Sequence, residues 1–365
     1  MQTEDIKKLD LSSPLPLPLV SIIIPVYNGE QYLEKLITSL EKQAYSNIEI
    51  IAVDNKSTDN SVKILNSFCT KITSLKIVLN ERNEGYCGGC NRGISNSNGE
   101  FLLFLSQDRI IEQDWLNKTI TRMLSDSKIG CVLGKVLREG ASTPEYGHAY
   151  DIYGAVLIKG SPEESNLFFA GGTVLIRRSI IEKIGAFDPE FFVYHEDVDL
   201  SWRMRLAGFT ISIVEDAVCH NIGGGISNTF NSEGKLHVSF DRELISMPVY
   251  KFYYSQRNRM RTMLKNYSRI RILKKLPIAI GLIFLRGLFM SFITKRSAYL
   301  FSVFRGLWWN VIHIQSTMRY RNEIQRIRVV DDIVIEEYMI KQSIELASMK
   351  MVRNSLFNRN KHKSV

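Results

Sequence analysis

The chain has 365 residues, 45% hydrophobic and 23% charged, so it can form one large domain or two modest ones and is not of the disordered class. Its net charge of +9 is unevenly placed, because residues 251–330 hold 17 Lys and Arg residues against one acid, Glu323. This block predicts contact with a polyanionic surface, either nucleic acid or an anionic membrane. Five cysteines without framework spacing, and an N-terminus unlike a signal peptide, predict a reducing, cytosolic compartment.

Strands and helices alternate over the first 80 residues. After a polar, Pro-rich stretch (1–18) that we expect to be a flexible lead-in, the run LVSIIIPV predicts a strand buried on both faces. Alternating strands and helices predict an α/β fold with a mostly parallel sheet and right-handed crossovers. The expected elements are a strand at 19–26, a helix at 30–43, a strand at 48–53, a helix at 61–68 and a strand at 75–79.

Polar turns follow the first two strands, at Tyr27-Asn28 and at 54–59. In parallel sheets, ligands bind beyond the carboxyl ends of the strands, so both turns are candidates for a binding site. Asp54 at the second strand end can accept hydrogen bonds from a nucleobase or ribose, or it can simply cap the next helix. The sequence leaves both readings open.

The next segment is Gly-rich, NEGYCGGCNRG from Asn83 to Gly93, and should pass close to a ligand or another backbone. Its Cys87 and Cys90 form a C-x-x-C motif without a second pair at zinc-site spacing, which favours two small packed residues over a metal or redox site. Asp108 follows the buried run FLLFL. It is a candidate ligand for a divalent cation held with phosphates, or an ordinary turn residue.

A strand at 131–137 and a loop-rich segment at 138–166 precede the stretch FFVYHEDVDLSWRMRLAGF, which begins at Phe191. Its acids Glu196, Asp197 and Asp199 stand at the start of a helix-like pattern. They either stabilise the helix N-terminus, or one of them is a carboxylate that accepts a proton from a hydroxyl.

The C-terminal third predicts an Arg-rich amphipathic helix at 253–266 and two apolar spans, 276–294 and 298–314. Arg286 and Arg305 interrupt these spans, and a central Arg costs about 2.5–3.5 kcal/mol on insertion scales. Amphipathic helices in the membrane interface are therefore favoured, with a membrane hairpin and a buried helical subdomain as the alternatives. We expect the tail at 354–365 to be disordered.

Six pieces, in order over residues 19–228, resemble inverting glycosyltransferases of family 2, which have the nucleotide-sugar-binding GT-A fold. Within this family the chain is most similar to the rhamnosyltransferase branch, which builds surface polysaccharides and lipid-linked glycans. The pieces are VSIIIPVYNGEQYLEKLITSL, IIAVDNKSTDNS, NEGYCGGCNRGI, FLLFLSQD, FAGGTVLIRRSIIEKIGAFDPEFFVYHEDVDLSWRMRLAGF and VCHNIGGGIS.

The resemblance implies roles for individual residues. Asp197 matches the catalytic base. Asp199 then has a structural or base-orienting role, and we expect Arg203, one turn further on, to pair with it. Asp108 matches the last acid of a D-x-D metal element whose first acid is here Ser106, and His220 matches a histidine that completes the metal site. The positions that match donor-binding residues are Pro25, Tyr27, Asn28, Asp54, Asn83, Gly85, Asn91 and Asp108.

The implied activity moves rhamnose or another hexose from a nucleotide-diphosphate sugar to a hydroxyl of a lipid-linked glycan or polysaccharide. Inversion needs one base and one cation, Mg²⁺ or Mn²⁺, at the leaving diphosphate. We expect a GT-A domain at 19–250 and a membrane-associating helical region at 251–353, peripheral on the cytoplasmic face of the cell membrane. The alternatives are an inactive nucleotide-binding scaffold and a nucleic-acid-binding protein. Intact Asp108, Asp197 and His220 argue against the first, and long apolar spans within the basic block argue against the second.

Overall fold

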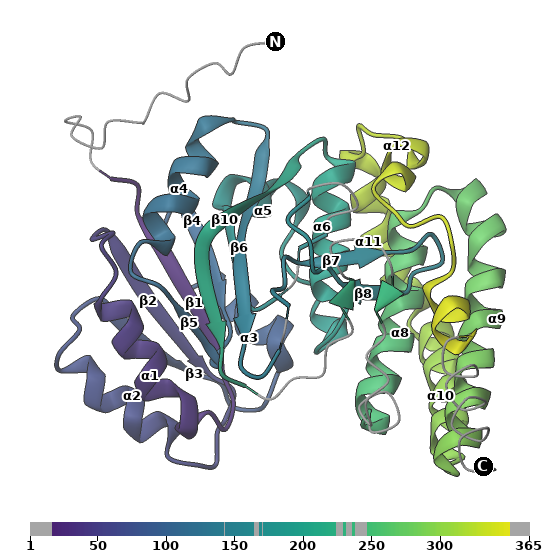
Figure 1. Cartoon of the computed structure of the whole chain (residues 1–365), viewed down its shortest axis with the longest axis horizontal. Helices are drawn as coiled ribbons and strands as arrows, with labels where there is room; N and C mark the ends of the chain where they lie inside the picture. Colours follow the sequence, from purple (N-terminus) through teal and green to yellow (C-terminus); the bar gives the residue numbers. More distant parts are fainter. Residues whose placement is uncertain are drawn as a thin grey trace, which may run out of the picture.

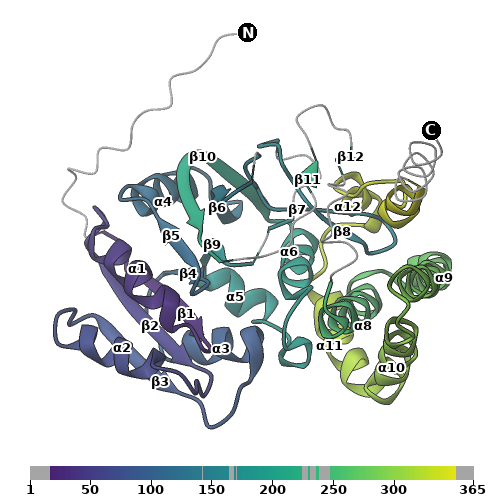
Figure 2. The same cartoon turned by 60° about the horizontal axis from the view of Figure 1, so that its bottom comes forward.

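The structure is a computed structural model with a sheet-based half and a helical half (Figures 1 and 2). The predicted tail at 354–365 and all but two residues of the predicted lead-in lie outside the described residues. The residues described are 17–141, 143–163, 168–169, 171–223, 229–230, 236–237 and 247–350.

An eight-stranded sheet forms the core of the first half, in the order β3-β2-β1-β4-β9-β6-β10-β5. The pairs formed by β1, β2, β3 and β4, and by β6 and β10, are parallel, whereas β9 and β5 pair antiparallel to their neighbours. The predicted mostly parallel α/β fold is thus confirmed. The strands are β1 (Val20–Val26), β2 (Ile48–Asp54), β3 (Leu75–Leu79), β4 (Phe101–Leu105), β5 (Arg109–Ile111), β6 (Ile129–Arg138), β9 (Thr173–Arg177) and β10 (Thr210–Asn221).

Helices cover both faces of this sheet, which explains why the central strands are apolar on both sides: β1 is buried at every position. One core lies between the sheet and α1, α2 and α4, and a second lies between the sheet and α3, α5 and α6. The helices are α1 (Glu30–Glu41), α2 (Ser61–Cys69), α3 (Gly85–Ile94), α4 (Trp115–Ser125), α5 (Arg178–Ile184) and α6 (Glu196–Leu206), with a short 3₁₀ turn η1 (Pro189–Phe191).

The helical half adjoins the sheet through α6. A third core joins α6 to a small second sheet and to α8, α9, α11 and α12, and a fourth joins α8, α9 and α10. The elements are β7 (His148–Tyr150), β8 (Val156–Ile158), β11 (Thr229–Phe230), β12 (Leu236–His237), α8 (Val249–Asn266), α9 (Arg269–Thr294), α10 (Ala298–Ile312), α11 (Ile314–Ile327) and α12 (Asp332–Glu337).

Packing is continuous across residue 250, where the composition changes. Trp202 of α6 and Tyr267, which follows α8, are both fully buried and meet edge to face with ring centroids 4.6 Å apart. The expected helix at 253–266 is present within α8, and it is buried along most of its length. Five of the 17 cations in the basic block are therefore buried in the protein: Arg257, Arg259, Arg261, Lys265 and Arg321.

Candidate functional site

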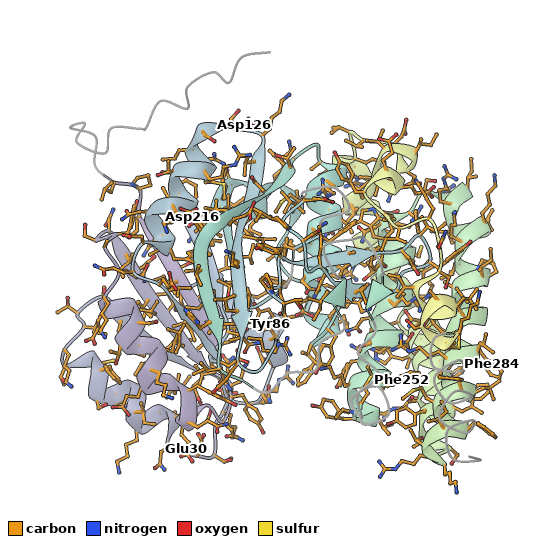
Figure 3. All side chains as sticks on the ribbon, viewed as in Figure 1. Glu30, Tyr86, Asp126, Asp216, Phe252 and Phe284 are labelled. Carbon is orange, nitrogen blue, oxygen red and sulfur yellow. The ribbon has the colours of Figure 1, made fainter. Side chains whose placement is uncertain are left out.

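A cavity of about 550 Å³ opens at the carboxyl ends of β1 and β4, where the sequence predicts a binding site. Tyr86 of α3 lines it, and Figure 3 places this residue where the sheet half meets the helical half. Of the predicted donor-binding residues, the cavity brings together Pro25, Tyr27, Asn83, Gly85 and Asp108.

Two close contacts shape the cavity. Gln107 forms reciprocal hydrogen bonds with the backbone of Tyr27, at 2.9 and 3.1 Å, and so joins the ends of β4 and β1. Gly85 has φ of +72°, and a Cβ there would lie 2.3 Å from the carbonyl oxygen of Phe192. The expectation that the Gly-rich segment passes close to another backbone is confirmed.

The other three predicted donor residues lie outside the cavity lining. The side chain of Asn28 accepts a hydrogen bond from the Thr58 N–H at 2.8 Å. Asp54 is 3% exposed; its Oδ2 accepts from the Ser57 N–H at 3.0 Å, while its buried Oδ1 has no hydrogen-bond partner among the described residues. Asn91 instead makes a reciprocal pair of hydrogen bonds with the Phe187 backbone.

Cys87 and Cys90 lie in α3 and are fully buried in the core beneath the sheet. Burial raises the pKa of both thiols well above the usual value, so neither is a reactive thiolate. The interpretation of two small packed residues is confirmed.

The two residues expected to hold a metal, Asp108 and His220, stand two register positions apart at the edge of the sheet where β10 pairs with β5. Because β10 pairs antiparallel with β5, His220 stands opposite Ile110, and its Nε2 lies 3.0 Å from Glu112 Oε1. Asp108 lines the cavity with its side chain 31% exposed. In the described part of the chain no cluster of three His, Cys, Asp or Glu side chains suits a metal ion. One carboxylate still fits a Mg²⁺ or Mn²⁺ ion whose remaining ligands are diphosphate oxygens and water.

Asp197 lies on the wall of a second cavity, of about 280 Å³. Its Oδ2 accepts from the Gly171 N–H at 2.9 Å and lies 3.1 Å from Nδ1 of His148, a residue of the small second sheet. Its Oδ1 accepts from the Val198 N–H at 2.8 Å. The carboxylate is therefore fixed from both sides, and neither it nor Asp199 is the N-cap of α6, because the helix begins at Glu196 after His195.

The pKa values of the two adjacent acids shift in opposite directions. Burial, reinforced by the charge of Asp197, raises the pKa of Glu196 well above its usual value. Burial would also raise the pKa of Asp197, but His148 and the two backbone N–H groups outweigh it and hold that pKa below its usual value. Burial lowers the pKa of His195 to about 3. Asp197 is thus ionised at neutral pH.

The turn before α6 has a strained backbone. Phe192, Tyr194 and His195 have φ of 63°, 69° and 67°, in the left-handed region that non-glycine residues rarely adopt. Asn258 of α8, fully buried, donates hydrogen bonds to the carbonyls of residues 191, 193 and 194 at 2.7–3.0 Å. Helix α8 therefore holds the segment that carries Asp197.

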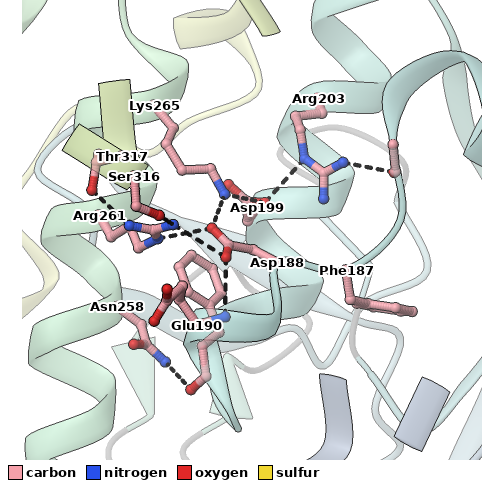
Figure 4. A network of polar contacts seen from close by, with 12 residues as sticks. Phe187, Asp188, Glu190, Asp199, Arg203, Asn258, Arg261, Lys265, Ser316 and Thr317 are labelled. Atoms are coloured by element: carbon pink, nitrogen blue, oxygen red, sulfur yellow. Dashed lines mark hydrogen bonds and ion pairs between the residues drawn. The ribbon is translucent and has the colours of Figure 1, made fainter. Parts of the chain in front are cut away.

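A buried network of charges fastens α6 to α8 (Figure 4). Lys265 donates to Asp188 at 2.7 Å and to Asp199 at 3.0 Å, and Arg261 pairs with Asp188 at 2.8 Å. Arg203 pairs with Asp199 at 3.0 Å, as the sequence predicts. Burial opposes ionisation of Asp188, yet Lys265 and Arg261 lower its pKa below the usual value. Asp188 is therefore held in its ionised form within the network.

Sequence reasoning missed His148, Asn258 and Gln107. Their partners lie 49 to 80 residues away along the chain, and no local spacing connects them. The only signal for His148 was its place in the loop-rich segment 138–166.

Comparison with known proteins agrees with this geometry. Residues 21–185 match the sequence model of the family described as Glycosyl transferase family 2. The glycosyltransferase AglE of Haloferax volcanii is 29% identical over 207 residues, which cover 56% of this chain and 67% of that protein. The O-antigen chain rhamnosyltransferase WbaN of Salmonella anatum is 28% identical over 210 residues, 55% of this chain and 65% of that protein.

A solved structure shares the fold. The crystal structure of GalNAc-T7 with UDP, GalNAc and Mn²⁺ aligns with a TM-score of 0.51 at 18% identity, over 68% of this chain and 49% of that one. The sheet-based half thus has the GT-A fold. The chain spans about two thirds of the length of the two curated relatives.

Proposed function

Because the chain carries a family 2 glycosyltransferase domain, we propose that it transfers a sugar from a nucleoside-diphosphate sugar to an acceptor hydroxyl with inversion. The observation that carries the proposal is an ionised, buried Asp197 on a cavity that adjoins the one lined by Asp108. Tyr194 lines both cavities. The proposed base, Asp197, and the proposed cation ligand, Asp108, thus line two adjoining cavities.

The larger cavity is suited to the donor. Tyr27, 45% exposed, is available to contact a base. Asp54 lies outside the cavity lining, but its buried Oδ1 has no hydrogen-bond partner among the described residues and could accept from a base or ribose N–H or O–H group. Asp108 would hold a divalent cation against the diphosphate. When bound, such a cation neutralises charge that develops on the departing nucleoside diphosphate.

Asp197 would accept the proton of the attacking hydroxyl. The N–H groups of Gly171 and Val198 fix its two oxygens, and His148 positions the carboxylate at the cavity wall. One ionised carboxylate suffices for a single inverting displacement, whereas retaining hydrolases use a pair of closely spaced carboxyl groups.

The named relative WbaN favours a rhamnosyl or other hexosyl donor and a lipid-linked glycan or polysaccharide acceptor. An inactive scaffold is disfavoured because Asp197 and its positioning contacts are intact. A nucleic-acid-binding role is disfavoured because Arg259, Arg261 and Lys265 of the basic block are buried in ion pairs.

Helices α9 and α10 lie at the end of the molecule farthest from β3, in both Figures 1 and 2. Helix α9 is the one helix in the described part of the chain that is long and apolar enough to cross a membrane. One side of it packs against α8 and α10, while Leu273 and Phe292 are 77% and 85% exposed. A helix packed on one side in this way fits the surface of an anionic membrane, on its cytoplasmic face, better than a span or hairpin.

Donor binding should depend on a divalent cation. We expect the correct nucleotide sugar with Mn²⁺ or Mg²⁺ to raise the melting temperature of the wild-type protein, and chelator to abolish that shift. Asp108→Asn should lose most of the shift, because it removes the carboxylate that would bind the cation. Asp216→Asn, on the exposed surface, is the control. A full shift in excess chelator would contradict metal-assisted binding.

Membrane attachment should depend on the exposed rings of α9 and α10. Phe292→Ser with Phe301→Ser, at positions 85% and 70% exposed, should weaken cosedimentation with phosphatidylglycerol vesicles by at least about tenfold, since burying one such side chain contributes about 1.5–3 kcal/mol. Leu79→Ser, at a 59% exposed position on the distant β3, is the matched control. Equal pelleting of the double variant and wild type would place attachment elsewhere. Release by carbonate would support surface helices, and a need for detergent would support a hairpin.

A further inference from the structure

Of the site residues predicted from the sequence, only Asp197 lines the smaller cavity. It lies between the β7–β8 hairpin, the start of α6, and helices α8 and α9. Most of its wall lies outside the family-matched residues 21–185. The polar lining that the argument uses comes from His148, Tyr194, Asp197, Ser255 and Arg259.

Arg259 lines this cavity and has one side-chain donor without a partner among the described residues. Its side chain is 1% exposed; Nη1 pairs with Glu345 at 2.8 Å, and Nε donates to the Tyr153 carbonyl at 2.8 Å. Nη2 is buried and has no hydrogen-bond partner among the described residues. Leaving such a donor unsatisfied is costly, so a ligand oxygen that reached it from the cavity would be stabilised by the hydrogen bond.

Two further polar atoms in the same lining are also buried without a hydrogen-bond partner among the described residues. They are Nδ1 of His195 and Oε2 of Glu196. The lining also includes the apolar side chains of Ala155 and Leu157. A ligand with polar edges and a small apolar face fits this combination.

The volume limits the size of that ligand. Pockets for drug-sized ligands are about 300–1,000 Å³, and this cavity of about 280 Å³ lies just below that range. It therefore suits one sugar ring and not a lipid chain or a longer glycan segment. Its shared wall at Tyr194 brings such a ring next to the donor cavity.

We propose that this cavity binds the terminal sugar ring of a glycan acceptor, with Arg259 Nη2 donating to one of its oxygens. The proposal rests on the proposed function and deepens it, because it assigns acceptor recognition to the C-terminal helices. In the reaction, the acceptor oxygen bonds to the anomeric carbon of the donor sugar. The bond from that carbon to the diphosphate oxygen breaks with its electron pair, and the hydroxyl proton passes to Asp197.

The test measures release of nucleoside diphosphate with and without simple acceptors. The probes are octyl rhamnoside, octyl mannoside, octyl galactoside and octyl glucuronide, each added to full-length protein with donor and Mn²⁺. At least one should accelerate release by the wild type. Ser255→Trp, at a half-buried lining position, should reduce that acceleration at least tenfold while the donor and Mn²⁺ still raise its melting temperature. Ser67→Trp, exposed on α2, should keep the acceleration.

Arg259→Lys provides a second variant that keeps the buried charge. It should raise the KM for the active octyl glycoside with a smaller effect on the donor-induced shift in melting temperature. The proposal is overturned if no glycoside accelerates release by a wild type that turns over donor, or if Ser255→Trp keeps the full acceleration. A wild type that neither binds nor turns over any nucleotide sugar would instead overturn the proposed function itself.

Discussion

Replacing Asp199 with Asn should destabilise the protein by about 3–5 kcal/mol, the usual cost of removing one partner from a buried ion pair. Asp199 is fully buried, and its Oδ2 lies 3.0 Å from both Lys265 Nζ and Arg203 Nε. The variant leaves these two buried cations with less counter-charge. Urea unfolding gives the free energy of unfolding directly.

A surface ion pair supplies the matched control for that measurement. Asp216 pairs with Lys118 at 3.5 Å but is 73% exposed, so Asp216→Asn should cost only about 0–1 kcal/mol. Equal losses for the two variants would show that the buried network does not hold α6 against α8.

Replacing Asp197 with Asn should lower turnover by roughly 10²–10⁴-fold, the usual span for loss of a general base. The amide keeps the shape of the side chain but cannot take the hydroxyl proton. Donor and metal binding should stay close to the wild-type level, because Asp197 does not line the donor cavity. Initial rates of nucleoside diphosphate release and the donor-induced shift in melting temperature together separate chemistry from binding.

His148→Gln supports the interpretation of that variant. The imidazole of His148 lies 3.1 Å from Asp197, and glutamine replaces it with another hydrogen-bond donor. Because Asp197 itself remains, the His148→Gln variant should lose less rate than Asp197→Asn. If Asp197→Asn keeps near-normal turnover while a well-folded Asp199→Asn is inactive, Asp199 is the base instead.

The half of the molecule built on the large sheet could be predicted from local patterns. Continuous apolar runs such as β1 identify strands buried on both faces, and parallel pairing then places the turns after β1 and β4 at the same edge. For this reason the sequence could predict that Tyr27 and Asp108, which are 81 positions apart, lie in one site.

The helical C-terminal region was also predicted, and α8, α9 and α10 confirm it, but its packing against the rest of the protein could not be predicted in the same way. A block with 17 cations and one acid resembles an exposed basic surface, but the acids that neutralise part of it lie outside the block, at Asp188, Asp199 and Glu345. Pairing over such distances leaves no periodic signal. The same is true of Asn258, because its buried amide hydrogen-bonds to the strained turn before α6, which is distant in sequence.

The stereochemistry of transfer tests the central claim most directly. The full-length protein with a nucleotide sugar and Mn²⁺ can be followed by proton NMR, reading the anomeric signal of the first product before mutarotation, or that of the transferred sugar on an octyl glycoside. A single displacement assisted by Asp197 predicts a product of inverted anomeric configuration, whose formation is lost in Asp197→Asn. A retained configuration, or an inverted product formed at the wild-type rate by Asp197→Asn, would contradict it.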